Sequence, residues 1–406
     1  MKLPEWVVRM RLGVVTPDAN GGVSLMRALG PLSAMAREDR RLELVLPHST
    51  GQGERSMGWS WLAGLDALFM SAPYTRHHGN LARMAKMMGL PVWVDWDDDL
   101  CCVPIYNPNC GAFNAEEIRP VLDTLVNLAD VVTVSTEEIK RRRTPEGNFG
   151  ESPKLTGGSP VPPGEGKIRV LPNGCQWPFT EGPRTKRIVW RGWGNHDADL
   201  LEVLPAIEAV ARDPKNAAWK WAFLGEPPWQ VSEAIPSGNL EHDTGADPML
   251  YMGMLCHLRP WLQIVPLKEN GFNRCRSNLA WIEASCAGAI TLAPAWEEWL
   301  RPGVRNYDGG RGARGAGREG EVYDGPDSFK NCLQRAINDF ALGQAMAFAK
   351  GGTRMMDGAR AIHSDVEESR AWIKENVAGK KLNEVRWEIV NGFVARVAGR
   401  EGEKKS

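Results

Sequence analysis

The sequence has few of the features that mark metal-binding, disulfide-linked or membrane-spanning chains. Its eight cysteines contain no CxxC pair and no zinc-ligand spacing, and among its seven histidines only His77 and His78 are adjacent. Scattered cysteines in a chain of 406 residues are typical of reduced, mostly buried thiols. No stretch approaches the ~18 apolar residues that cross a bilayer, and residues 1–15 lack the apolar core of a signal peptide. We therefore expect a soluble, cytoplasmic protein without a membrane span.

Net charge is also nearly absent. The formal charge is -1, so the whole chain exerts no attraction on nucleic acid or an anionic membrane, and such a partner needs a local patch. Two local basic clusters occur, at residues 140–143 and 311–318. Each alone is typical of a solvated surface. With aromatic side chains such as Trp96 and Trp193, both clusters together would suit a nucleic-acid backbone and a flipped base. For most of the seventeen tryptophans we expect core packing.

Short apolar runs alternate with helical patterns along most of the chain, which predicts an α/β fold with parallel, doubly wound sheets. In the first half the pattern predicts strands at 12–16, 42–46, 67–70, 91–95, 131–135 and 168–171, and helices at 23–35, 81–88, 115–128 and 137–143. In the second half it predicts strands at 188–190, 219–224, 261–265 and 289–292, and helices at 198–212, 249–256, 276–287, 329–340 and 367–396.

The alternation stops and restarts, which indicates two domains with a ligand-binding cleft between them. We expect an N-terminal Rossmann-like domain at 1–180, in which the Pro-, Gly- and Ser-rich residues 144–167 form a loop or insertion. A C-terminal Rossmann-like domain is expected at 181–365, and a helical tail at 366–406 that packs back on the N-terminal domain.

Residues 266–288 combine a strand end, a polar turn and a helix predicted to begin near Arg276 and Ser277. The first turn of a helix offers free N–H groups and the positive end of the helix dipole, which suit a diphosphate. Arg276 adds a positive charge and Ser277 a hydroxyl, and Glu283 could accept two ribose hydroxyls. An ordinary amphipathic helix with a solvated Arg and Glu is the other interpretation.

Four short motifs resemble glycosyltransferase family 4, which has the GT-B fold, and they occur in that family's order. Glu-Ala-Ser-Cys-Ala-Gly at 283–288 resembles its Glu-Ala-Met-Ala-x-Gly signature, and Gly21-Gly22 is similar to its N-domain double glycine. Pro-Asn-Gly at 172–174 resembles the tripeptide before its domain linker, and Arg191 stands where the family has an arginine on the donor diphosphate. The resemblance covers residues 10–345. Phe-Asn-x-x-Arg-Ser at 272–277 is similar to variants in glycosyltransferases encoded by phages.

The resemblance implies two facing Rossmann-like domains that transfer a hexose from a nucleoside diphosphate sugar, UDP-glucose by preference, with retention of the anomeric configuration. The UDP-sugar is then a substrate, no cofactor is tightly bound, and no divalent metal is required, because GT-B enzymes stabilise the leaving diphosphate with cations and helix dipoles. The implied donor-binding residues are Gly21, Gly22, Arg191, Asn273, Arg276, Ser277 and Glu283.

Three departures from the family pattern limit what the resemblance implies. Cys275 stands where the family often has a first glutamate, eight positions before Glu283. Arg276 replaces the usual phosphate lysine. Asp97 and Asp98 fill the place of the N-domain histidine. The sugar and the catalytic details are therefore not implied.

The acidic run at 95–99 has three interpretations: a divalent-metal site, a general base for the acceptor hydroxyl, or a cap for the following helix. We rank the metal site last. Because the run follows a strand, where active-site residues gather, we predict that Asp97 or Asp98 is catalytic.

The predicted acceptor contacts are Arg76 and His77, which follow the third strand, Trp96, and His196 in the loop after the first C-domain strand. His196 is more often a helix-start residue than a catalyst. For the acceptor we favour a 5-hydroxymethylpyrimidine in double-stranded phage DNA, which would place the enzyme in the host cytoplasm. Polysaccharide or lipid-linked sugar is the second choice.

A non-catalytic GT-B module that binds nucleotide sugar or nucleic acid is a further alternative, kept open by Cys275. A dehydrogenase is not kept as an alternative, because residues 17–22 lack the GxGxxG fingerprint and the GxGxxG at 310–315 follows no predicted strand. No protein partner is implied.

Overall fold

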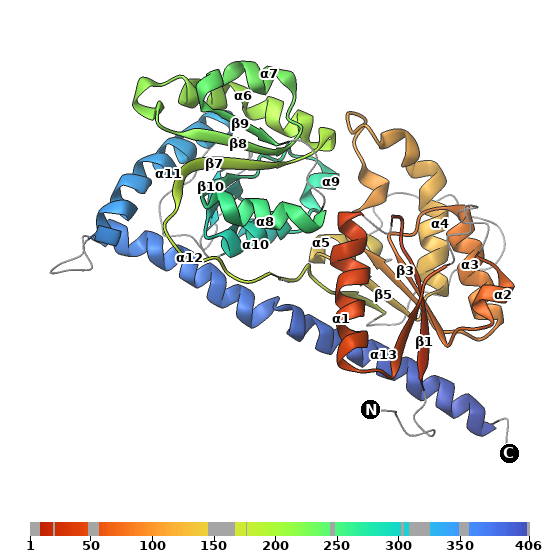
Figure 1. Ribbon diagram of the computed structural model, residues 1–406. Coiled ribbons are helices and arrows are strands. Elements are labelled where there is room, and N and C mark those ends of the chain that lie inside the picture. Colours follow the sequence, from red (N-terminus) through yellow and green to blue (C-terminus); the bar gives the residue numbers. More distant parts are fainter. Residues whose placement is uncertain are drawn as a thin grey trace.

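The computed structural model describes residues 9–18, 21–47, 57–144, 167–175, 177–243, 248–301, 304–307, 325–348 and 357–403 (Figure 1). The predicted loop at 144–167 therefore lies outside the described residues except for its two ends. The basic cluster at 311–318 and the GxGxxG at 310–315 lie outside them entirely.

The N-terminal sheet has six parallel strands in the order β2-β1-β3-β4-β5-β6. Its two central strands, β3 and β4, are buried along their whole length, as expected for a parallel sheet that helices cover on both faces. The strands are β1 (Met10–Val15), β2 (Leu42–Val45), β3 (Ala67–Ser71), β4 (Val92–Trp96), β5 (Val131–Val134) and β6 (Ile168–Val170). The helices are a π-helix (Ser24–Leu29), α1 (Gly30–Glu38), α2 (Trp59–Leu62), α3 (Arg76–Met87), α4 (Ala115–Leu128) and α5 (Glu137–Arg143), with 3-10 turns at Leu100–Cys102 and Cys110–Ala112.

The C-terminal sheet is also six-stranded and parallel, in the order β12-β11-β10-β7-β8-β9. Its strands are β7 (Thr185–Gly192), β8 (Lys220–Gly225), β9 (Leu240–Asp243), β10 (Pro260–Ile264), β11 (Ile290–Pro294) and β12 (Val304–Tyr307). Its helices are α6 (Asp197–Ala211), α7 (Trp229–Ala234), α8 (Pro248–Leu258), α9 (Gly271–Arg274) and α10 (Leu279–Ala287), with 3-10 turns at Gly194–His196, Pro214–Asn216, Ser237–Asn239 and Glu297–Trp299. The two restarting α/β series of the sequence are thus two separate Rossmann-like sheets.

Three C-terminal helices join the two domains: α11 (Gly325–Phe348), α12 (Asp357–Asn376) and α13 (Gly379–Glu403). The first packs on α6, the second on α10, and the third on α1, so the chain crosses back along the base of both domains (Figure 1). Buried apolar residues of α12 and α13 belong to one cluster with residues of α1 and α10, such as Leu32 and Trp281. The tail therefore connects the two hydrophobic cores.

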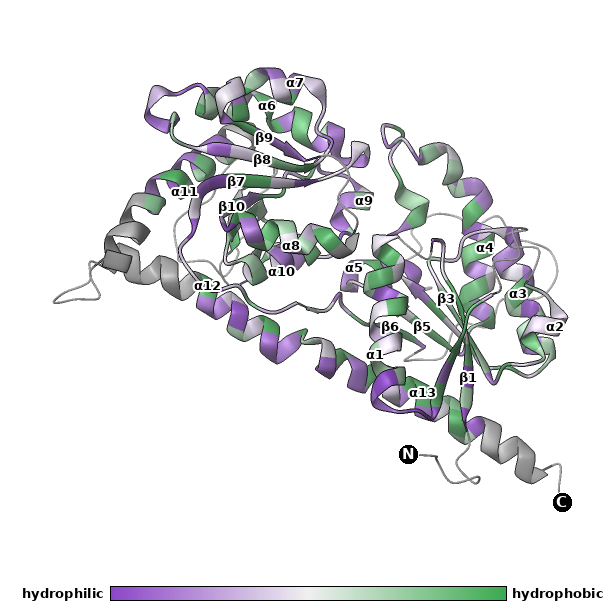
Figure 2. Ribbon diagram, in the orientation of Figure 1, coloured by the Kyte–Doolittle hydropathy of each residue, from purple (hydrophilic) through white to green (hydrophobic). Residues whose placement is uncertain are grey.

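Apolar residues concentrate in the strands and on the inner sides of the helices, and polar ones on the outer sides (Figure 2). Many tryptophans contribute to this interior, among them Trp93, Trp221, Trp281 and Trp299, which are almost completely buried. Among the described helices, none is both long and apolar enough to span a bilayer.

The structure corrects one predicted boundary that bears on function. The helix predicted at 276–287 begins later, at Leu279, and a separate short helix, α9 (Gly271–Arg274), precedes it. Arg276 and Ser277 thus lie in the connection between them rather than in a first helical turn. The sequence also gave no indication of α2, α7, β9 and β12.

Candidate functional site

A cavity of about 520 Å³ lies between the two domains, at the edge where the strands of both sheets end. The N-terminal domain contributes the loops after β1, β3, β4 and β6, and the C-terminal domain contributes those after β7, β8 and β10. The polar and charged lining residues are Tyr74, Asp97, Asp98, Asn107, Asn109, Asn173, Arg191, Asn195, His196, Tyr251, Gln263, Arg276, Ser277 and Glu283. This is the place where open α/β sheets bind ligands.

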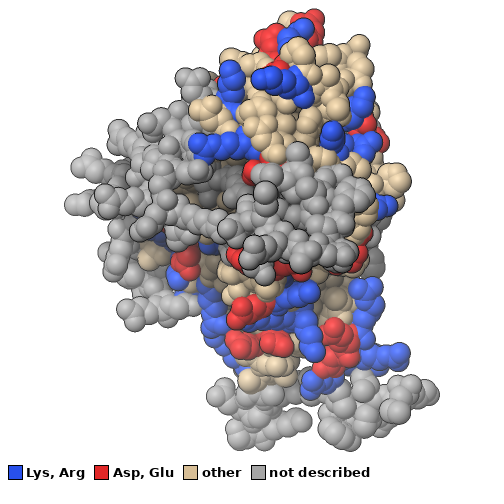
Figure 3. Space-filling model, turned by 90° about the vertical axis from the view of Figure 1, so that its left-hand side faces the viewer, with Lys and Arg blue, Asp and Glu red and all other residues tan. Residues whose placement is uncertain are grey.

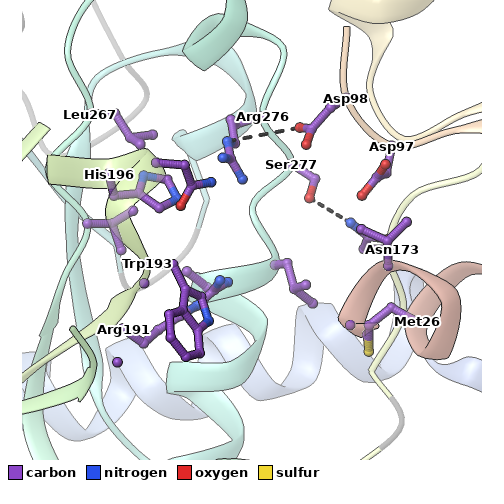
Figure 4. A pocket seen from close by; sticks show the side chains of 18 of the residues that line it. Met26, Asp97, Asp98, Asn173, Arg191, Trp193, His196, Leu267, Arg276 and Ser277 are labelled. Carbon is purple, nitrogen blue, oxygen red and sulfur yellow. Dashed lines mark hydrogen bonds and ion pairs between the residues drawn. The ribbon is translucent and has the colours of Figure 1, made fainter. Parts of the chain in front are cut away.

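On the C-terminal side, the connection between α9 and α10 brings Arg276 and Ser277 to the cavity (Figure 4). Leu279 and Ala280, the first residues of α10, line it as well, so the free N–H groups at the start of this nine-residue helix open into the cavity. The Arg276 guanidinium lies over the Phe272 ring at 5.0 Å and 4.0 Å from Asp98 across the cleft. Of the residues predicted to form a phosphate cradle at 266–288, Arg276, Ser277 and Glu283 thus lie together on the cavity wall.

Arg191, at the end of β7, forms an ion pair with Glu283 of α10 at 3.0 Å. The Tyr251 hydroxyl of α8 donates to the same Glu283 oxygen, Oε2, at 2.6 Å. Burial raises the pKa of Glu283 in spite of Arg191 and Tyr251, and burial also raises the pKa of Tyr251 well above its ordinary value. Oε2 is therefore engaged within the domain, and Oε1 has no hydrogen bond to another side chain in the part of the chain that the structure describes.

His196 lines the same side of the cavity, and its Nδ1 lies 2.8 Å from Asp199 Oδ2. Asp199 is buried, and its other oxygen accepts from the Lys268 backbone N–H and from the Asn273 amide, both at 2.8 Å. Burial lowers the pKa of His196, and Arg276 lowers it further, although Asp199 acts in the opposite direction. The imidazole is thus held as a neutral ring with Nε2 directed away from Asp199.

On the N-terminal side, the aspartates of the acidic run at 95–99 lie in three different environments. Asp97 and Asp98 line the cavity opposite Arg276 and Ser277 (Figure 4). Burial, and then the charge of Asp98, raise the pKa of Asp97 to about 7. A carboxyl group with such a pKa is suited to exchange a proton with a bound hydroxyl at neutral pH.

The other two aspartates of the run are structural. Asp95 is buried and binds Arg27 with both oxygens, at 2.6 and 3.0 Å. Asp99 caps the 3-10 turn Leu100–Cys102 and pairs with Arg143 of α5. The capping interpretation therefore applies to Asp99.

Several predicted site residues lie away from the cavity lining. Trp96 is buried in the core, where its indole N–H donates to the Pro73 carbonyl at 3.0 Å. Asn273 is buried behind the lining, bound to Asp199. Arg76 is exposed at the start of α3 next to His77, and only Tyr74 of that segment reaches the cavity.

The two glycines of the N-domain loop differ in position. Gly22 lines the cavity, and a Cβ added there would meet no atom within 4 Å, so this side of the cavity is open. Gly21 lies one residue outside the lining, where its N–H donates to the Asp18 carbonyl at 3.1 Å.

Cys275, which replaces the family's first glutamate, is fully buried and packs into the N-domain core. Its carbonyl accepts a hydrogen bond from the Thr136 hydroxyl at 3.1 Å, so this position anchors the turn rather than reaching the cavity.

Sequence reasoning missed Tyr251 and Gln263, whose side chains line the cavity from α8 and β10. Nothing in the local sequence marks them, because their function depends on packing against α10. It also assigned no role to Asn173, although the Pro-Asn-Gly motif was recognised. The Asn173 side-chain amide donates to Ser277 Oγ at 2.6 Å across the cleft.

The basic cluster at 140–143 is neutralised by carboxylates. Lys140 pairs with Glu137, Arg141 and Arg142 with Glu138, and Arg143 with Asp99. On the face shown in Figure 3, the visible Lys and Arg side chains of the described residues are interspersed with Asp and Glu side chains. Nor does the described part of the chain hold a group of three or more His, Cys, Asp or Glu side chains arranged to bind a metal ion.

The structure is similar to solved glycosyltransferase structures. Anabaena HepE in complex with UDP-glucose aligns with a TM-score of 0.54 and 10% identity, covering 95% of this chain and 100% of the other. The catalytic domain of starch synthase IV from Arabidopsis thaliana, bound to ADP and acarbose, aligns with a TM-score of 0.54 and 11% identity over 93% and 99% of the two chains. The chain has the GT-B fold.

Staphylococcus aureus TarM, in a complex that contains UDP, gives a TM-score of 0.51 and 12% identity over 82% of this chain. The chain covers only 58% of TarM and 59% of the pneumococcal O-GlcNAc transferase GtfA. No protein-family model matches the sequence, and no curated protein matches it. The GT-B fold thus rests on the arrangement of the two sheets and not on overall sequence similarity.

Proposed function

We propose that the protein is a glycosyltransferase that moves a hexose from UDP-glucose to a hydroxyl group of an acceptor. One observation supports this most directly. The Nε groups of Arg191 and Arg276 are buried without a hydrogen-bond partner among the described residues, in the same cavity as the open end of α10. Buried unpaired N–H groups on cations cost free energy until an anion binds to them. A diphosphate between the two arginines satisfies both.

The arrangement suits the chemistry of sugar transfer. When the bond between the sugar C1 and the diphosphate breaks, negative charge develops on the leaving phosphate oxygen, and Arg191, Arg276 and the α10 dipole stabilise it there. Asp97 and Asp98 face these groups from the N-terminal domain, where one of them receives the proton of the acceptor hydroxyl. Glu283 Oε1 accepts from the ribose. We propose retention of the anomeric configuration on the family resemblance alone.

The N-domain side of the cavity favours an uncharged acceptor. Its described lining residues include two carboxylates and no lysine or arginine, and its apolar and aromatic members are Pro17, Val23, Leu25, Met26, Ala72, Tyr74, Leu100, Val103, Phe113 and Trp177. A DNA backbone would meet the two aspartates, and the cations at 140–143 are already paired. We therefore propose that the acceptor is an uncharged molecule with a hydroxyl group, and we rank hydroxymethylated phage DNA as the second candidate.

The first test is hydrolysis of UDP-glucose by the purified protein, with UDP release as the readout. Arg276→Ala is expected to reduce kcat/KM by about a hundredfold, since a stabilising group aimed at a developing charge contributes about that much or more. Arg274→Ala is the matched control, because Arg274 lies two residues away, pairs with Glu269 and is outside the cavity lining. If no nucleoside diphosphate sugar binds or is hydrolysed, the proposal is wrong. Donor binding with no turnover on any acceptor would favour the non-catalytic module.

A second test addresses the acceptor. The protein and UDP-glucose are incubated with oligosaccharides, lipid-linked sugars, or DNA that contains 5-hydroxymethylcytosine or 5-hydroxymethyluracil, and the products are read by mass spectrometry. A hexose mass shift on the neutral sugars alone supports the first choice. A shift on hydroxymethylated DNA alone overturns it in favour of the second.

A further inference from the structure

His196 has a protein environment that fixes one ring nitrogen and leaves the other for a ligand. Asp199 accepts two N–H bonds on Oδ1, from Lys268 and Asn273, and faces His196 Nδ1 with Oδ2. The two N–H donors fix the position of the Asp199 carboxylate. His196 Nδ1 therefore carries a proton and donates it in a hydrogen bond to Asp199 Oδ2. Nε2, on the far side of the ring, has no protein partner among the described residues. The His196 side chain is 13% exposed, and the residue lines the cavity.

The charges around this imidazole come from every element that packs on it. Asp197 and Asp199 lie in the first turn of α6, directly after the 3-10 turn that ends at His196; Arg191 comes from the end of β7, and Arg276 from the connection between α9 and α10. Asp98 approaches from the N-terminal domain at 4.0 Å from Arg276. Lys268 is turned away to Glu202, at 3.6 Å. Burial, Arg276 and Arg191 oppose a positive charge on His196 and lower its pKa.

A bound anion favours the protonated, positively charged form of His196. A diphosphate brings two negative charges to the space that Arg191, Arg276 and His196 share, and an opposite charge within about 4–6 Å raises a histidine pKa by roughly 1–3 units. The held Asp199 already favours the imidazolium through Nδ1. A proton from solvent then adds to Nε2, which becomes a donor to a phosphate oxygen.

We propose that the protein binds its nucleoside diphosphate sugar with uptake of a proton at His196, which serves as a third, switchable cation of the phosphate site. This rests on the proposed function and deepens it, because it makes donor affinity depend on pH. His196 is then a ligand of the donor rather than of the acceptor.

The test is titration calorimetry with UDP-glucose in buffers that differ in ionisation enthalpy, where the slope of the observed enthalpy gives the number of protons taken up. UDP-glucose is the required probe, because a terminal phosphate titrates near pH 6 and would add its own protons, whereas a diphosphate diester has no such group. We expect uptake approaching one proton per donor near pH 7.5. The uptake should decrease at lower pH, as more of the imidazole is protonated before the donor binds.

Three variants test whether His196 is the group that takes up the proton. His196→Asn keeps an N–H for Asp199 and removes the titration, so uptake should vanish, and affinity should fall about tenfold at pH 6 through loss of a charge-assisted hydrogen bond. At pH 8.5 the loss should be less than about twofold, because the wild-type ring then carries less of its charge. His242→Asn is the matched control, because the His242 side chain is not part of the cavity lining, although its Nε2 lies 2.9 Å from the carbonyl oxygen of the lining residue Gly225, and uptake should persist.

Asp97→Asn removes a carboxyl group of the cavity lining whose pKa is about 7, and uptake should persist in this variant too. The proposal is overturned if UDP-glucose binds the wild type without proton uptake, or if uptake survives in His196→Asn and is lost in Asp97→Asn. If UDP-glucose does not bind at all, the proposed function fails and this inference fails with it. Binding that weakens in Arg276→Ala but shows no proton linkage overturns the inference alone.

Discussion

Asn173 and Ser277 are 104 residues apart in sequence, yet the Asn173 side-chain amide donates a hydrogen bond of 2.6 Å to the Ser277 hydroxyl across the cleft. Asn173 Oδ1 in turn accepts from Arg27, a buried residue of the π-helix. A neighbouring contact, from the Thr136 hydroxyl to the Cys275 carbonyl, also crosses the cleft. The N-terminal domain thus holds the connection between α9 and α10 from three positions, Asn173, Thr136 and Asp98, directly at the proposed phosphate site.

We expect Asn173 and Ser277 to act together on donor binding. Asn173→Ala and Ser277→Ala should each raise the KM for UDP-glucose, and the double variant should be less impaired than the product of the two effects. The expected coupling is about 1 kcal/mol, that of a single hydrogen bond. A double-mutant cycle on kcat/KM measures it, and strictly additive effects would contradict the prediction.

Glu283 is predicted to bind the ribose although Arg191 and Tyr251 share one of its oxygens. Glu283→Gln leaves Arg191 without its carboxylate, and we expect kcat/KM for UDP-glucose to fall at least tenfold. Tyr251→Phe keeps the ion pair and removes only the shared hydrogen bond, so a loss of about 1 kcal/mol, or fivefold, is expected. The check is to compare UDP-glucose with donors that lack the 2′- or 3′-hydroxyl.

If Glu283 contacts the ribose, one deoxy donor should lose affinity in the wild type and lose no more in Glu283→Gln. Equal sensitivity of both proteins to the deoxy donors would show that Glu283 only positions Arg191.

Asp97 links stability to pH. Its folded-state pKa of about 7 exceeds the ordinary value of 3.8, so between these values the folded protein binds more protons than the unfolded one. Stability therefore decreases as the pH rises through this window. Asp97→Asn does not titrate, and its free energy of unfolding relative to wild type should improve between pH 4 and 8 by on the order of 2 kcal/mol.

Urea unfolding at both pH values measures the effect of Asp97→Asn. Asp98→Asn should reduce the same pH dependence, since the charge of Asp98 is the second cause of the raised pKa. An Asp97→Asn variant whose stability follows the wild type at both pH values would refute the prediction.

The sequence was informative where the physics is local. A parallel sheet covered on both faces produces strands with runs of apolar residues, such as 67–70 in β3 and 92–94 in β4, and these can be recognised without a structure. The start of α10 could not be recognised from the sequence. Its start at Leu279 depends on Asn273 binding Asp199 and on Cys275 binding Thr136, which are contacts across 74 and 139 residues.

The same reason explains the acidic run at 95–99. The sequence pattern places the acidic run at the end of a strand, where active sites form, and predicts Asp97 or Asp98 as the reactive group. It could not separate these from Asp95 and Asp99, because the arginines that bind the latter two, Arg27 and Arg143, lie 68 and 44 residues away. Trp96 was misplaced for a related reason: an aromatic residue in that run was expected at the cleft, whereas strand β4 directs it into the core.

The Arg27–Asp95 pair makes a final prediction about stability. Both side chains are almost completely buried, and Thr133 adds a third hydrogen bond to Asp95 at 2.5 Å. Removing one partner of such a pair leaves an uncompensated buried charge, so Asp95→Asn should cost about 3–5 kcal/mol of unfolding free energy. Asp39→Asn is the matched control, because Asp39 also binds an arginine with both oxygens, but Arg41 is 59% exposed. That substitution should cost less than about 1 kcal/mol. Thermal unfolding of both variants decides the point: similar losses would mean that burial does not set the strength of the Arg27–Asp95 pair, and that Asp95 does not hold the residues behind Asn173 in place.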